Sequence, residues 1–86
     1  EQAERDLARL REQHRTTEKE ATDRDLELKA LEEKKARFES QLYGGTVRNP
    51  RQLSDLQGEV TMLSREISKV EDRILELMEA LESERS

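Results

Sequence analysis

The chain of 86 residues is 43% charged and only 2% aromatic, and its formal net charge at pH 7 is -5. Its mean hydropathy of -1.10 leaves too few apolar side chains for a globular core, so these must lie in a stripe along a helix. The absence of cysteine excludes a disulfide framework and cysteine-ligated zinc within these residues. The acidic balance argues against a general nucleic-acid-binding surface but leaves room for a local basic patch.

No apolar run approaches the length needed to span a membrane, and no segment has the pattern of a signal peptide. The sequence therefore predicts a cytoplasmic protein without membrane contact. The chain starts at Glu1 rather than at methionine and stops at Ser86 within a helical pattern. We expect it to be an excerpt of a longer protein.

A first helix is predicted over about residues 1–43. Steps of four and three residues alternate from Ala3 to Leu42, which is the spacing of a coiled-coil seam. Most seam positions are apolar, and the polar ones hold His14, Thr17, Arg24 and Lys35. The apolar stripe of this helix is therefore interrupted.

A turn is predicted at residues 44–49. Gly44 and Gly45 are adjacent, and glycine can adopt the left-handed backbone angles that end a helix. Pro50 suits the first position of a helix, and Asn49 before it can accept hydrogen bonds from free amide groups. Gln52 completes the spacing of a capping box. One helix is therefore expected to end here and another to begin.

A second helix is predicted over about residues 50–86. Its seam has the same spacing as the first but no polar interruption. The seam residues are Leu53, Leu56, Val60, Leu63, Ile67, Val70, Ile74, Leu77 and Leu81. This is the stronger seam, because every position can bury an aliphatic side chain.

The short connection between two long helices predicts an all-α fold, a long antiparallel coiled-coil hairpin that forms one domain over residues 1–86. Pairing Leu42 with Leu56 sets the register of the two seams. The further layers are Phe38 with Val60, Lys35 with Leu63, Leu31 with Ile67, Leu28 with Val70, Arg24 with Ile74, Ala21 with Leu77 and Thr17 with Leu81.

Flanking charges favour this hairpin over the competing fold, a parallel homodimer. The hairpin brings Lys34 near Glu66 and Glu27 near Arg73, whereas parallel pairing would bring acidic residues together. The parallel dimer would also place Arg24 against its own copy in the seam.

The predicted register leaves residues 1–12 without a partner in the same chain. We expect this segment to fray, to pair with another chain, or to pair with a continuation of the second helix. Pairing with another chain would make the protein an oligomer.

No catalytic constellation is recognisable, since the chain has one histidine, no cysteine and no serine in a nucleophile motif. His14 lies on the seam, and the residues three and four positions after it are only Thr17 and Glu18, so packing or solvation is favoured over metal binding. The sequence predicts a protein that is not an enzyme and holds no cofactor or metal within these residues.

Carboxylates follow one flank of the predicted hairpin. Glu18, Asp25, Glu32 and Glu39 share an edge of the first helix, and Glu71 lies on the same edge of the hairpin. Such a run is usually a solvated face, but an acidic edge without neutralising neighbours also suits a basic partner.

The tip around the turn carries two alternative predicted contact surfaces. The residues expected to contact a protein partner are Tyr43, Thr46, Val47, Arg48 and Arg51. The alternative is contact with RNA or DNA phosphates, since phosphate binding needs only a few well-placed cations. The residues expected to make it are Lys34, Lys35, Arg37, Arg48 and Arg51. We also expect Tyr43 and Val47 to pack the turn against Leu42 and Leu53.

The segment from Leu42 to Leu53 reads LYGGTVRNPRQL, and it is followed by Val70-Glu71-Asp72 and by LELME over residues 75–79. This pattern resembles the bacterial coiled-coil proteins that end in a four-cysteine zinc ribbon and are often described as nucleic-acid-binding. The match covers roughly residues 28–82 and is most specific at the turn.

The resemblance implies an N-terminal hairpin followed by a zinc ribbon, in a cytoplasmic protein that acts by binding. Some relatives are linked to flagellar biogenesis through sigma factor 54 or messenger RNA, and others to secretion components. Zinc is expected only in a part of the parent protein beyond the C-terminus of this chain.

We therefore predict a non-enzymatic interaction or scaffold module that presents its tip and flanks to a protein partner. The resemblance points to a sigma factor or to a flagellar or secretion component as that partner. The alternatives are nucleic-acid binding through the tip and a passive spacer that holds terminal domains about 60 Å apart, a length given by the helical rise.

Overall fold

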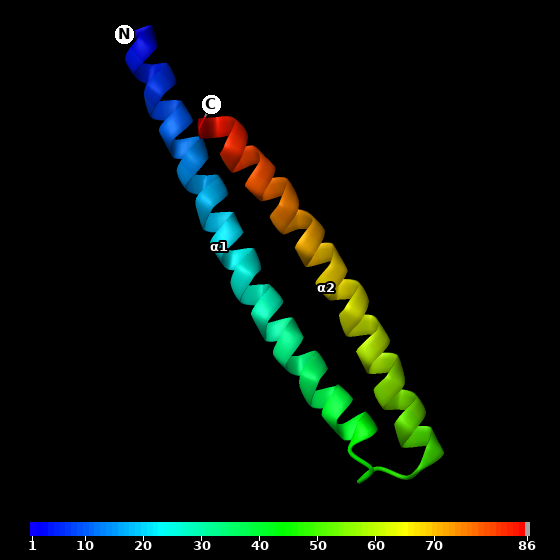
Figure 1. Ribbon diagram of the computed structural model, residues 1–86. Coiled ribbons are helices and arrows are strands. Elements are labelled where there is room, and N and C mark those ends of the chain that lie inside the picture. The colour runs from blue at the N-terminus through cyan, green and yellow to red at the C-terminus, as the bar shows by residue number, and fades with distance from the viewer. Residues whose placement is uncertain (86) are drawn as a thin grey trace.

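The computed structural model describes residues 1–85 and contains two helices, α1 (Gln2–Tyr43) and α2 (Pro50–Arg85). The helices lie side by side and antiparallel, joined by one short turn (Figure 1). The molecule is a rod with extents of 69 × 16 × 14 Å. The predicted all-α antiparallel hairpin is confirmed. Ser86, which the predicted second helix includes, lies outside the described residues.

The core lies along one side of α2. Leu63, Val70 and Leu77 are the buried apolar residues, with 3%, 8% and 4% of their surface exposed, and they are spaced one heptad apart. No residue of α1 is buried, because polar side chains such as Arg24 and Lys35 occupy part of its seam. The uninterrupted seam of α2 therefore forms most of the core, as its sequence pattern predicts.

Contacts at the open end of the hairpin fit the predicted register. The Nδ1 atom of His14 lies 2.7 Å from Oε2 of Glu84. This pair is the next layer after Thr17 with Leu81 when the predicted pairing is continued by one seam step. The same register places the half-buried Lys35 opposite Leu63, where its aliphatic stem can cover the core while its ammonium group reaches water.

The predicted ion pairs on the flank are wrong. Arg73 binds Glu20 rather than Glu27, with distances of 2.7 Å from Nε to Oε2 and 2.9 Å from Nη2 to Oε1. Glu27 instead pairs with Arg24 on its own helix, at 3.0 Å. Glu20 and Glu27 lie on the same edge of α1, so a long arginine side chain can select either one. Within residues 1–85, Lys34 forms no ion pair.

The turn depends on Gly45, which has a φ of 76°, in the left-handed region. Gly44 keeps right-handed angles of φ -77° and ψ -8°, and a Cβ there would lie 2.5 Å from the carbonyl oxygen of Ser40. Asn49 caps α2, since its Oδ1 accepts hydrogen bonds from the amides of Arg51 at 2.9 Å and Gln52 at 3.4 Å. Gly44, Gly45 and Asn49 thus have distinct structural roles in the turn.

The N-terminal part of α1 extends past the end of α2 (Figure 1), and residues 1–13 have no buried or half-buried side chain. They are exposed, including Leu7 and Leu10, of which 49% and 60% of the surface is accessible. The backbone is nevertheless helical from Gln2, with a first hydrogen bond of 3.1 Å from the amide of Arg5 to the carbonyl of Glu1. The structure therefore presents this segment as a helix with one exposed apolar edge.

Neither α1 nor α2, over residues 1–85, combines the length and the apolarity that crossing a membrane requires.

Candidate functional site

The turn brings the predicted partner-binding residues together at one end of the rod. Thr46, Arg48 and Arg51 are exposed there, and Tyr43 has 76% of its surface accessible. Val47 is half-buried. Tyr43 was expected to pack the turn against Leu42 and Leu53, but its side chain is exposed rather than packed.

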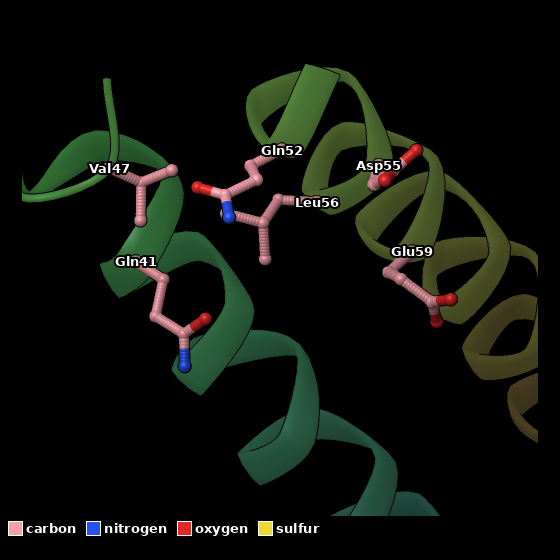
Figure 2. A pocket seen from close by; sticks show the side chains of 6 residues that line it. All are labelled: Gln41, Val47, Gln52, Asp55, Leu56 and Glu59. Atoms are coloured by element: carbon pink, nitrogen blue, oxygen red, sulfur yellow. The ribbon is translucent and has the colours of Figure 1, made fainter. Parts of the chain in front are cut away.

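A hollow of about 340 Å³ lies beside the turn on one edge of the hairpin. Figure 2 shows Val47 from the turn and Gln41 from α1 facing Gln52 and Leu56 from α2, with Asp55 and Glu59 beside them on α2. Val47 and Leu56 supply apolar surface, the amide groups can donate and accept hydrogen bonds, and the carboxylates add negative charge. No lysine or arginine lines this hollow.

A second hollow next to the turn places Tyr43 beside the apolar residues that close the seam. It has a volume of about 420 Å³. Its lining residues are Leu42, Tyr43, Pro50, Leu53, Ser54 and Gln57. Tyr43 thus borders Leu42 and Leu53 as expected, but as the exposed wall of a hollow rather than as a packed residue.

The residues of the alternative nucleic-acid surface do not gather on one face. Lys35 is half-buried in the seam, whereas Arg37 is exposed and projects about 200° away from it around the helix axis. Lys34, Arg48 and Arg51 are exposed. Within residues 1–85, none of these cations forms an ion pair.

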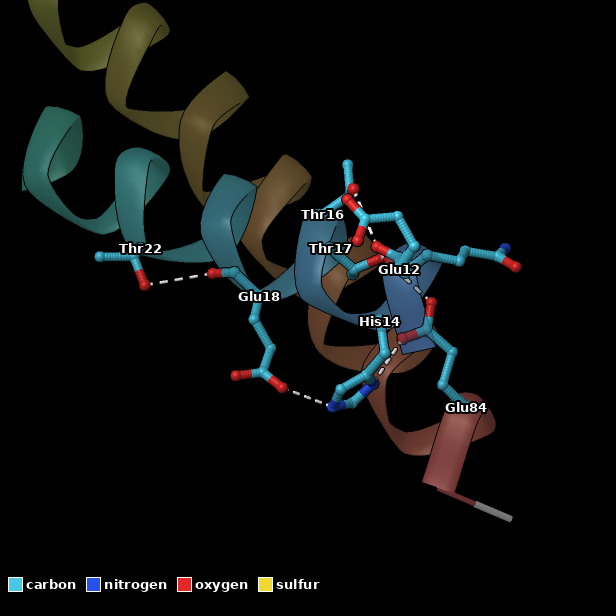
Figure 3. A network of polar contacts seen from close by, with 8 residues as sticks. Glu12, His14, Thr16, Thr17, Glu18, Thr22 and Glu84 are labelled. Atoms are coloured by element: carbon cyan, nitrogen blue, oxygen red, sulfur yellow. Dashed lines mark hydrogen bonds and ion pairs between the residues drawn. The ribbon is translucent and has the colours of Figure 1, made fainter. Parts of the chain in front are cut away.

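The open end of the hairpin holds a polar network centred on His14 (Figure 3). Its Nδ1 contacts Glu84 and its Nε2 contacts Glu18, while the hydroxyl of Thr17 donates to Oε1 of Glu84 at 3.0 Å. Sequence reasoning missed Glu84, although continuing the register by one layer places it opposite His14. No group of three or more metal-ligating side chains that could hold an ion is found among residues 1–85.

A second polar connection between the helices lies at the middle of the rod. Arg73 bridges Glu20 on α1 and Glu76 on α2, with 3.0 Å from Nη1 to the Glu76 carboxylate. The hydrogen bonds that Arg73 donates lower the pKa of the Glu20 carboxyl, and their acceptance by Glu20 raises the pKa of the guanidinium. Both groups are partly exposed, so this bridge orients the helices more than it stabilises them.

The hairpin geometry agrees with the comparison with protein families. The family model of the CT398-like coiled coil hairpin domain matches residues 1–86. No curated protein and no solved structure matches this chain. Such a hairpin is a structural fold that is not typically catalytic, and it suits a structural or interaction role. The predicted resemblance to the hairpin of a coiled-coil family is thereby confirmed, and the chain belongs to the CT398-like coiled coil hairpin domain family.

Proposed function

We propose that this hairpin is an interaction module that presents its tip to a protein partner in the cytoplasm. The observation that carries the proposal is the hollow beside the turn, in which Val47 and Leu56 supply an apolar floor and no cation is present. Tyr43, with 76% of its surface accessible, borders the other hollow at the turn. Exposed aromatic residues beside a hollow are typical anchors of protein interfaces.

The tip offers complementary parts to such a partner. An apolar side chain of the partner would enter between Val47 and Leu56, and the amides of Gln41 and Gln52 would form hydrogen bonds with polar groups of the partner beside it. Tyr43 would bury its ring against the partner at low cost in side-chain entropy. The class of partner that the family resemblance suggests is a sigma factor or a flagellar or secretion component.

The test is capture of proteins from an extract of the parent cell by the wild-type hairpin and by the variant Tyr43→Ala with Val47→Ser. We expect at least one captured protein to be reduced about tenfold or more, since losing interface anchors costs roughly 2 kcal/mol. The control is Leu26→Ser with Met62→Ser, which removes side chains that are 61% and 50% exposed outside the tip. Equal capture by all three proteins would show that the tip is not the binding site.

Nucleic-acid binding is the second candidate function, favoured by the lack of ion pairs at Arg48 and Arg51 within residues 1–85. Arg48→Glu with Arg51→Glu tests it against defined RNA and DNA strands. Phosphate contacts would give an affinity that falls steeply with salt and that the double variant abolishes. An affinity unchanged by the double variant would rule out this use of the tip.

A further inference from the structure

Away from the tip, two hollows join along one edge of the rod near the end of α2. The first, of about 480 Å³, is lined by Asp25, Leu28, Glu71, Asp72, Ile74 and Leu75. The second, of about 500 Å³, is lined by Leu75, Met78, Glu79, Glu82 and Ser83. Leu75 belongs to both, so they form one continuous surface, which we call the acidic groove.

The floor of the acidic groove is apolar and open. Leu75 and Met78 have 58% and 57% of their surface exposed, and beside them lie the half-buried Leu28 and Ile74 from the seam. Leu75 and Met78 are not seam residues that pack against α1, so the fold does not account for their apolar character. Exposed apolar side chains gathered in this way are typical of a docking surface.

The rim of the groove is negatively charged throughout. All the charged residues that line it are carboxylates, and neither hollow has a lysine or an arginine in its lining. Within residues 1–85, Asp25, Glu71, Asp72 and Glu79 form no ion pair. The repulsion between such neighbouring like charges is relieved when a cationic partner binds.

We propose that the acidic groove is the docking site of a basic amphipathic helix from a protein partner. From Glu71 to Ser83, α2 rises by about 18 Å, which matches about three turns of a partner helix. Leucine-like side chains spaced three or four residues apart would contact Leu75 and Met78. Lysine or arginine side chains on both flanks would lay their stems along the floor and reach the carboxylates.

The negative charge of the groove favours a basic helix over nucleic acid or a second copy of this chain. Nucleic acid would meet carboxylates with its phosphates and be repelled. A second copy of this chain has a net charge of -5, and docking groove against groove would bring carboxylates together, so it brings repulsion where a basic helix brings attraction. The inference rests on the proposed role as an interaction module, but it uses a surface separate from the tip.

The experiment measures the affinity of the hairpin for a synthetic peptide by fluorescence anisotropy. The probe is a helical peptide of about four turns with leucine at every third or fourth position and lysine elsewhere. A second peptide has serine in place of every leucine and therefore the same charge. We expect the leucine peptide to bind at least about tenfold more tightly, because apolar contact adds to the attraction between charges.

Two protein variants locate the binding on the groove. Leu75→Ser with Met78→Ser should weaken binding of the leucine peptide about tenfold, whereas the control Leu26→Ser with Met62→Ser should leave it unchanged. The control removes the same residue types at similar exposure, 61% and 50%, outside the groove. Circular dichroism melting confirms that each variant remains folded.

Charge reversal tests whether the carboxylates of the rim contribute to peptide binding. Asp72→Lys with Glu79→Lys should weaken binding about tenfold and flatten its salt dependence. Asp23→Lys with Glu33→Lys makes the same change in net charge at exposed positions outside the groove, and it should have a much smaller effect.

Several outcomes would overturn the proposal. If the groove and control variants weakened peptide binding equally, or if the two peptides bound with equal affinity, the binding would result only from general attraction between charges. If the wild-type hairpin forms a dimer that Leu75→Ser with Met78→Ser dissociates, and the leucine peptide does not compete, the occupant is a second copy. Tyr43→Ala should not affect peptide binding, so the proposals for the groove and for the tip can be refuted independently.

Discussion

At the scale of single residues, the glycines differ in what they contribute. Gly45 has a φ of 76°, which other residues adopt only under strain, whereas Gly58 lies within α2 with open space around the place that a Cβ would take. We expect Gly45→Ala to lower the free energy of unfolding by about 1 kcal/mol and Gly58→Ala to raise it by about 0.5–1 kcal/mol. Urea titration of both variants measures the difference, and destabilisation by Gly58→Ala would mean that this position has an unrecognised packing role.

Arg24 leaves a hydrogen-bond donor without a partner at the core. Its Nε is buried and has no hydrogen-bond partner, although its Nη1 pairs with Glu27 at 3.0 Å. Replacing it by methionine keeps much of the aliphatic side chain and removes the unpaired donor. We expect Arg24→Met to raise the free energy of unfolding by about 1 kcal/mol. Arg65→Met, on the exposed face of α2, is the control and should change it by less than about 0.5 kcal/mol.

At the scale of the helices, the contact of Arg73 with Glu20 links α1 to α2 in a pH-dependent way. The hydrogen bonds from Arg73 lower the pKa of Glu20 below its usual value of 4.5. A lowered pKa means that the contact contributes stability above the unfolded-state pKa and loses it as pH falls through the folded-state pKa. Glu20→Gln should therefore be less stable than the wild type at neutral pH and equal to it in strong acid.

Denaturant titrations of the wild type and Glu20→Gln at a series of pH values check this prediction. Glu33→Gln serves as the control, because Glu33 is exposed and forms no ion pair within residues 1–85. If the difference between the wild type and Glu20→Gln did not change with pH, the link between the helices would not depend on this charge.

At the scale of the whole molecule, the repeat of the seam makes the rod adjustable in length. Deleting residues 27–33 from α1 and residues 65–71 from α2 removes one matched heptad and keeps every remaining layer in register. We expect a folded hairpin shorter by about 10 Å, measured by small-angle X-ray scattering against the present extent of 69 Å. Unchanged binding at the tip with lost activity of the parent protein would support the spacer function.

The heptad seams, the glycine pair and the capping pattern at Asn49 determined the hairpin by themselves. Backbone preferences and apolar periodicity act locally, so they can be read from the chain, and the register followed from pairing Leu42 with Leu56. The acidic edge was visible in the same way from the spacing of Asp25 and Glu71.

Only the tertiary structure decided which long side chains meet across the seam and which remain exposed. Arg73 reaches Glu20 instead of Glu27, and His14 meets Glu84, because flexible side chains choose among several partners of similar energy. The exposure of Tyr43, and the meeting of Leu75 with Leu28 and Asp25 around one hollow, depend on where α1 ends and how the helices rotate about each other. Those angles are set by packing over the whole length of the rod, which no local pattern in the sequence specifies.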